Sequence, residues 1–173
     1  KPASEETLAM LLKSFKLPTF ARDYAAAGEQ AAREGLTHPA YLLALAKLEA
    51  QERSERRVRR LLDDSQLPSE KNLATFDLSR LSPKTRSSFN ALKDGAFLDR
   101  AENVLAFGNP GTGKTHLLCA LGQELARQGR PVLYVKAFHL VQKLLAAKRD
   151  LKLPGELRRL DRFDAVLLDD IGY

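Results

Sequence analysis

One stretch of eight residues decides the fold: Gly108-Asn109-Pro110-Gly111-Thr112-Gly113-Lys114-Thr115, which matches the pattern G-x-x-x-x-G-K-T. The apolar run 103–107 before it predicts a strand, and residues 114–128 after it predict a helix with an apolar stripe. Glycines allow a tight turn whose N–H groups point inward, where they can donate to phosphate oxygens. The positive N-terminal end of the helix favours the same anion. A glycine-rich turn without a ligand is the alternative, and the agreement of all fixed positions and both flanking elements disfavours it.

Two side chains of this loop carry the predicted chemistry. Lys114 is a compact cation that can reach the β- and γ-phosphates of a bound ATP, and the Thr115 hydroxyl can ligate Mg²⁺. His116 follows on the helix and is typical of a packing or capping residue rather than a base. The predicted ATP contacts are this histidine and the eight loop residues, Gly108, Asn109, Pro110, Gly111, Thr112, Gly113, Lys114 and Thr115.

A second apolar run, residues 165–168, predicts a strand that ends in Asp169 and Asp170. Such a strand end is uninformative by itself, but after a phosphate-binding loop it has a specific meaning. Asp169 would hold Mg²⁺ through coordinated waters, and Asp170 would orient or deprotonate the attacking water. The predicted metal ligands are therefore Thr115 and Asp169, and the predicted catalytic residues are Lys114 and Asp170.

Hydrolysis of ATP is predicted less directly than its binding. The charge that develops in the transition state usually needs an arginine from the same or a neighbouring subunit. Arg158, Arg159 and Arg162 lie before the acid strand and are typical of a solvated helix face. We therefore expect ATPase activity in a longer, oligomeric protein, and ATP binding with poor hydrolysis in this chain.

The remaining sequence predicts helices first and alternating strands and helices afterwards. One helix follows Ser4 as an N-cap, and two more span 20–35 and 39–62. Downstream we expect a helix at 84–92, a strand at 132–135, a helix at 138–147 and a polar stretch at 148–162 with a Pro154-Gly155 turn. The alternation indicates a parallel α/β sheet. We expect a helical domain at 1–66 and an α/β domain at 67–173.

Composition narrows the class of protein. The 173 residues have 28 Lys and Arg against 22 Asp and Glu, and the formal charge of +6 weakly favours a polyanionic partner. The single cysteine, Cys119, excludes a disulfide framework and a multi-cysteine metal site. No apolar run is long enough to span a membrane, and no signal segment opens the chain, so a cytoplasmic location is expected. Because the chain starts at Lys1 and stops just after a predicted buried strand, we expect a piece of a longer protein.

Five segments in a fixed order resemble the IstB-like ATP-binding proteins, the transposition-helper ATPases of bacterial insertion sequences, which are related to the DnaC helicase loader. The resemblance runs from about Tyr41 to the end of the chain. Its segments are Arg56–Leu62, Asn72–Asp77, Ala101–Leu105, the phosphate-binding loop and Leu167–Tyr173.

This resemblance implies an AAA+ fold: a P-loop NTPase parallel sheet with flanking helices, preceded by a small all-helical domain. It also implies an ATP-dependent homo-oligomer on double-stranded DNA that recruits a partner transposase. Phe76 corresponds to a position near the adenine. Relatives continue past the acid strand (Walker B) with a sensor strand, an arginine finger and a lid, so the resemblance implies a core truncated after that strand.

Two basic clusters are candidate DNA contacts through phosphates. In the first, five Arg and two Glu leave a local charge of +3, although Glu52–Arg56 and Glu55–Arg59 are spaced as ordinary helix ion pairs. A solvated helix face is the alternative, and the resemblance favours DNA. The second cluster lies in a segment, roughly 138–160, that faces DNA as an extra helix in relatives. The candidates are Arg53, Arg56, Arg57, Arg59, Arg60, Lys143, Lys148, Arg149 and Lys152.

Two other functions remain open from the sequence. A replicative helicase loader would use the same ATPase core on a protein partner. A small P-loop kinase would need an acceptor pocket and a lid, and no segment suggests either.

Overall fold

The structure is a computed structural model that describes residues 2–171, with side chains described from residue 6 onward. Gly172 and Tyr173, the last residues of the Walker B segment, lie outside the described residues. The chain divides into two compact units, Lys1–Arg57 and Val58–Tyr173. The domain boundary expected between residues 66 and 67 remains a prediction.

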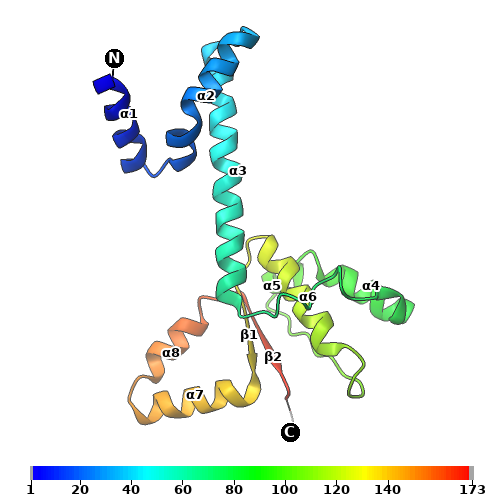
Figure 1. Cartoon of the computed structure of the whole chain (residues 1–173). Coiled ribbons are helices and arrows are strands. Elements are labelled where there is room, and N and C mark those ends of the chain that lie inside the picture. The colour runs from blue at the N-terminus through cyan, green and yellow to red at the C-terminus, as the bar shows by residue number, and fades with distance from the viewer. Residues whose placement is uncertain (1, 172–173) are drawn as a thin grey trace. The chain divides into compact units, whose positions relative to one another are not determined.

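The first unit is helical, as the apolar periodicity predicted (Figure 1). It contains α1 (Pro2–Ser14), α2 (Pro18–Glu34) and the N-terminal part of α3 (His38–Ser65). The predicted N-cap at Ser4 is wrong, because α1 already begins at Pro2, a residue type that suits a first helical turn. Helix α3 continues to Ser65 and so runs from the first unit into the second.

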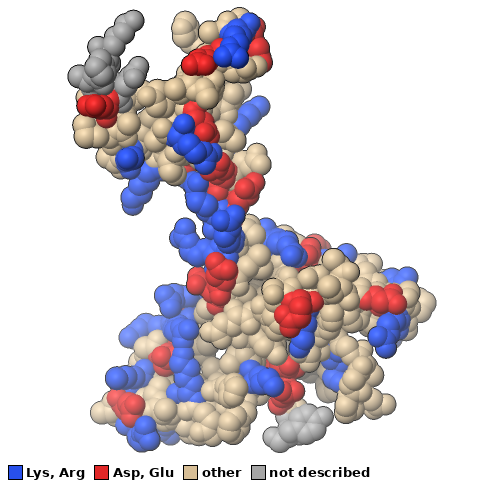
Figure 2. All heavy atoms as spheres, in the orientation of Figure 1, with Lys and Arg blue, Asp and Glu red and all other residues tan. Residues whose placement is uncertain are grey.

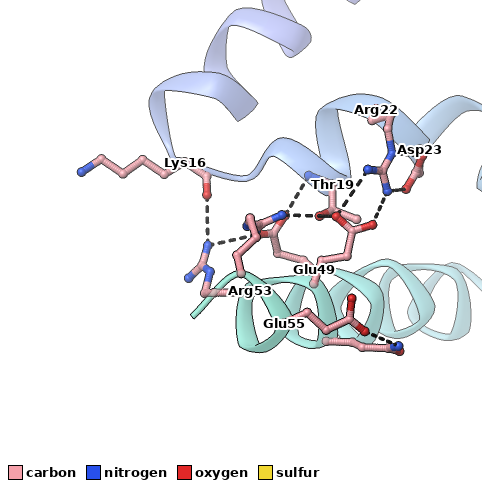
Figure 3. A network of polar contacts seen from close by, with 10 residues as sticks. Lys16, Thr19, Arg22, Asp23, Glu49, Arg53 and Glu55 are labelled. Atoms are coloured by element: carbon pink, nitrogen blue, oxygen red, sulfur yellow. Dashed lines mark hydrogen bonds and ion pairs between the residues drawn. The ribbon is translucent and has the colours of Figure 1, made fainter. Parts of the chain in front are cut away.

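A buried carboxylate ties α2 to α3 within the first unit (Figure 3). Glu49 of α3 is 4% exposed and accepts the Thr19 backbone N–H at 2.9 Å. Arg53 and Arg56 contact its other oxygen at 3.2 and 3.1 Å. Burial raises the pKa of Glu49, but the bonds from Thr19 and the charge of Arg53 outweigh it and lower the pKa overall. Glu49 is therefore ionised at neutral pH, with both oxygens paired.

The second unit is an α/β fold with a parallel sheet and flanking helices (Figure 1). Its described strands, β1 (Val132–Lys136) and β2 (Ala165–Asp169), pair in parallel from Val132↔Ala165 to Lys136↔Asp169. Its helices are η1 (Leu78–Arg80), α4 (Pro83–Leu92), α5 (Ala96–Asp99), α6 (Lys114–Arg127), α7 (Ala137–Arg149) and α8 (Leu153–Leu160). The core is formed by Phe89, Phe97, Leu121, Leu125 and Val132. The predicted fold class is confirmed.

Two predicted elements differ from the structure. Residues 103–107 are not a strand, because within the described residues the sheet consists of β1 and β2, and this run is not hydrogen-bonded to either. Its Leu105 and Phe107 are 71% and 87% exposed. An apolar run becomes a strand only when a neighbour pairs with its backbone groups. The predicted Pro154-Gly155 turn is instead the first turn of α8, where proline is tolerated because the missing N–H needs no partner.

The sequence did not indicate two short elements, α5 and η1. None of the described helices combines the length and apolar character needed to cross a membrane.

Candidate functional site

The loop 108–115 leads directly into α6 and has the tight turns that its glycines predicted. Gly111 and Gly113 have φ angles of +77° and +87°, a backbone region that side chains disfavour. Gly113 is the N-cap of α6, and a Cβ there would lie 3.0 Å from Cε2 of Phe76. Glycine is therefore needed at position 113 both for backbone conformation and for space.

The Lys114 ammonium lies across the loop. Its Nζ donates to the carbonyl oxygens of Gly108 at 2.8 Å and Asn109 at 2.9 Å. These bonds keep the ammonium at the start of α6. The helix N-terminus and the ammonium both favour an anion at this place. A phosphate group can replace the two carbonyls as a stronger, charged acceptor.

Thr115 and Asp169 meet although they come from different elements. The Thr115 hydroxyl, at the start of α6, donates to Asp169 Oδ1 at 2.8 Å, and the Tyr134 hydroxyl of β1 donates to Oδ2 at 2.8 Å. Burial raises the pKa of Asp169, but the two hydroxyls, aided by the Asp170 backbone, lower it overall. The carboxylate is therefore ionised and fixed in orientation.

These oxygen atoms fit a magnesium ion. Thr115 and Asp169 supply a hydroxyl and a carboxylate, the hard donors that Mg²⁺ takes together with substrate phosphates. Thr115 and Asp169 would hold the ion. Bound Mg²⁺ would offset the charge on the β- and γ-phosphates. Tyr134 was not identified from the sequence, although strand alternation does place it on the same face of β1 as Lys136.

Asp170 has a different environment from Asp169. It follows β2 with a φ of +56°, is exposed, and its Oδ2 lies 3.1 Å from Lys136 Nζ. Asparagine and aspartate adopt such a φ more readily than most residues, so the turn is compatible with this side chain. The carboxylate predicted to act on water is thus ion-paired at the end of β1.

Phe76 and His116 lie together beside the loop. Their rings meet edge to face with centroids 5.0 Å apart, and His116 Nε2 is 3.1 Å from both Thr75 Oγ1 and the Asn72 carbonyl oxygen. His116 thus attaches the segment 72–76 to α6, as a packing residue. Phe76 lines a cavity of about 490 Å³ that also includes Gly108, Gly113 and Lys114. The cavity is adjacent to the phosphate-binding loop.

A profile of the family described as IstB-like ATP binding protein matches residues 10–173. The chain belongs to this family. It is 37% identical over 170 residues to an insertion sequence ATP-binding protein of Sinorhizobium fredii, with 98% of this chain and 57% of the relative covered. The IS21 ATP-binding protein of Pseudomonas aeruginosa is 32% identical (96% and 63% covered), and the IS5376 protein of Geobacillus stearothermophilus is 31% identical (91% and 62% covered). The chain spans about three fifths of the length of these relatives.

In this IstB-like chain, four of the five arginines of α3 fall into two groups. Arg53 and Arg56 pair with the buried Glu49, and Arg56 also contacts Glu52 at 3.2 Å. Arg59 and Arg60 are exposed, and neither of them forms an ion pair with any of the described residues. The expected Glu55–Arg59 pair is absent from this part of the structure, because Glu55 accepts from Gln51 at 3.0 Å instead.

The second basic cluster lies on α7 and α8 and the turn between them. Figure 2 shows Lys and Arg side chains gathered over these helices, with fewer Asp and Glu among them. Lys143 pairs with Glu156 at 2.9 Å and Arg149 with Asp150 at 3.1 Å. Lys148 and Lys152 are exposed, and neither has an ion pair among the described residues. The segment 138–160, which the resemblance predicted to carry one extra helix, here contains two helices, α7 and α8.

Proposed function

We propose that the chain binds ATP together with Mg²⁺ at the loop 108–115. The observation that carries this proposal is the 2.8 Å contact between the Thr115 hydroxyl and Asp169, at the mouth of a loop with the required sequence. The position of Lys114 across the loop supports contact with the β- and γ-phosphates. The cavity lined by Phe76 is large enough to hold an adenine base.

The biological role that we propose is assistance to a partner transposase in DNA transposition. The relatives that match over most of this chain are named as insertion sequence ATP-binding proteins, which favours transposition over helicase loading or a metabolic kinase. ATP binding would promote assembly of the whole protein into a homo-oligomer on double-stranded DNA. The basic residues of α3, α7 and α8 would contact phosphates and so give no sequence preference. Asp170 would act on the attacking water in the whole protein.

Nucleotide binding is tested by titrating the chain with a fluorescent ATP analogue in the presence of Mg²⁺. Lys114→Ala should abolish binding and leave the helical circular dichroism unchanged. Lys47→Ala, which removes the same charge from an exposed position of α3, is the matched control and should bind as wild type does. Undiminished affinity in Lys114→Ala would contradict the site.

The role in transposition is tested with partner proteins and DNA. Binding to a DNA duplex should strengthen when ATP is added and weaken as salt rises. Pull-down from a mixture of transposase and replicative helicase should recover the transposase. Recovery of a replicative helicase alone would favour the loader, and DNA affinity unaffected by nucleotide and salt would exclude the proposed role.

A further inference from the structure

The carboxylate of Asp169 is held by hydroxyl groups on both of its oxygens. Thr115 donates to Oδ1 and Tyr134 donates to Oδ2, each at 2.8 Å. Thr115 belongs to the phosphate-binding motif, whereas Tyr134 lies on β1, outside every motif found in the sequence. The function proposed above assigns a role to Thr115 and none to Tyr134.

The sheet register explains why a tyrosine at position 134 reaches this carboxylate. Tyr134 pairs with Leu167, two residues before Asp169, so all three side chains project from the same face of the parallel pair. A shorter hydroxyl residue at this position would not extend along the strand as far as Asp169. The long phenol therefore has a specific use here, beyond filling space next to Leu167.

The tyrosine hydroxyl is a permanent donor in this environment. A phenol is protonated throughout the neutral range, so its O–H remains available to donate to Asp169 Oδ2. Because Oδ2 is occupied by this donor, Oδ1 is the oxygen that faces Thr115. Without the phenol, Asp169 would lose the hydroxyl donor on Oδ2 and would rotate more freely.

We propose that Tyr134 is a positioning residue of the magnesium site, which orients Asp169 so that Oδ1 faces the ion held beside Thr115. This inference rests on the proposed binding of ATP with Mg²⁺ at the loop. Tyr134 does not line the cavity beside the loop, so its effect should be confined to the step at which Mg²⁺ joins the complex. ATP binding without the metal is independent of it.

The test is the Mg²⁺ dependence of ATP-analogue binding by the 173-residue chain with Tyr134→Phe, which keeps the ring and removes the hydroxyl. The Mg²⁺ concentration for half-maximal binding should rise about tenfold, the usual effect of one hydrogen bond to a charged group. Affinity for the analogue in EDTA should be unchanged. Loss of packing alone would lower the affinity for the analogue both with Mg²⁺ and in EDTA, so the two affinities together separate positioning of Asp169 from packing.

Tyr41→Phe is the matched control, because it removes a hydroxyl that donates to the Tyr24 carbonyl at 2.8 Å in the first unit. It should leave the Mg²⁺ dependence unchanged. A second measurement places Tyr134→Phe in an Asp169→Asn background, where it should have no further effect. Wild-type chain that fails to bind the analogue with Mg²⁺ would refute the proposed function. If the wild-type chain binds the analogue, two results would refute only the role of Tyr134. One is a Tyr134→Phe variant that behaves as wild type does, and the other is additive effects in the double variant.

Discussion

The Thr115 hydroxyl lies 2.8 Å from Asp169 Oδ1, although 54 residues separate the two along the chain. Thr115 is in the first turn of α6, and Asp169 is the last residue of β2. Packing of α6 against the sheet, in part through Leu121 and the adjoining Leu167, brings the two together. Packing of the core thus brings together the two residues of the proposed magnesium site. Neither residue belongs to that core, so substitutions at either should leave the fold intact.

Asp169→Asn should raise the Mg²⁺ concentration that ATP binding requires. The asparagine amide is a weaker metal ligand than the carboxylate. Its NH₂ group is a donor and would face one of the two hydroxyls, which are donors as well. The half-saturating Mg²⁺ concentration should rise about tenfold or more, by loss of a charged partner. Isothermal titration with Mg²⁺ at saturating ATP measures this. An unchanged Mg²⁺ requirement would remove Asp169 from the proposed site.

Gly113→Ala should destabilise the second unit and weaken ATP binding. The left-handed backbone costs a residue with a Cβ about 1–2 kcal/mol, and the new methyl group would lie 3.0 Å from Phe76. Gly155→Ala is the control: its backbone has no positive φ, and no atom lies within 4 Å of an added Cβ. Inside α8 that substitution should stabilise the chain by about 0.5–1 kcal/mol. Thermal unfolding of both variants gives the comparison, and equal effects would contradict the loop geometry.

The local parts of the site could be predicted from sequence, because residue type alone determines them. Gly111, Gly113 and Lys114 specify the turn and the start of α6 whatever surrounds them. The acid pair after residues 165–168 could be recognised only because it follows the phosphate-binding loop in the sequence. Phe76 required the resemblance to IstB-like proteins, since nothing in its neighbourhood indicates a nucleotide.

The remaining features depend on pairings that a linear pattern does not contain. Residues 103–107 and 165–168 have the same apolar character, yet only the second run has a hydrogen-bonded neighbour. The contact of Tyr134 with Asp169 follows from the register of β1 against β2, and that of Lys136 with Asp170 from the turn after β2. The strand register and the turn both form only on folding, so neither Tyr134 nor Lys136 could be assigned to its aspartate from the sequence.

His116→Ala should loosen the segment 72–76 and lower ATP affinity severalfold. The substitution removes the Nε2 contacts with Thr75 and Asn72 and the edge contact with Phe76. Amide hydrogen exchange in residues 72–76 should accelerate about fivefold, as expected for one lost hydrogen bond. His139→Ala, an exposed histidine of α7, is the control and should leave that segment unaffected. Unaltered exchange in His116→Ala would show that other contacts hold the segment.

Glu49→Gln should destabilise the first unit at neutral pH by about 1–3 kcal/mol, through loss of charged hydrogen bonds in a buried position. Its pKa is lowered in the folded chain, so its contribution is present above the unfolded pKa and is lost as pH falls through the folded pKa. The difference between wild type and variant should therefore shrink below about pH 4. Urea unfolding followed by helical circular dichroism measures it. Glu55→Gln, on an exposed part of α3, should have little effect at any pH.

The two groups of arginines on α3 should respond differently in DNA binding. Arg59→Gln combined with Arg60→Gln removes two exposed charges that have no ion pair among the described residues, so stability should be unchanged. If both contact phosphates, the slope of log affinity against log salt should fall by about 2. Arg56→Gln should instead lower stability, because it leaves Glu49 with one arginine fewer. Arg33→Gln, whose partner Glu29 lies 3.3 Å away on α2, controls for net charge. A salt slope that falls equally in the Arg33 variant would show that the α3 cluster acts only through overall charge, because a specific phosphate contact requires a fixed position along the DNA.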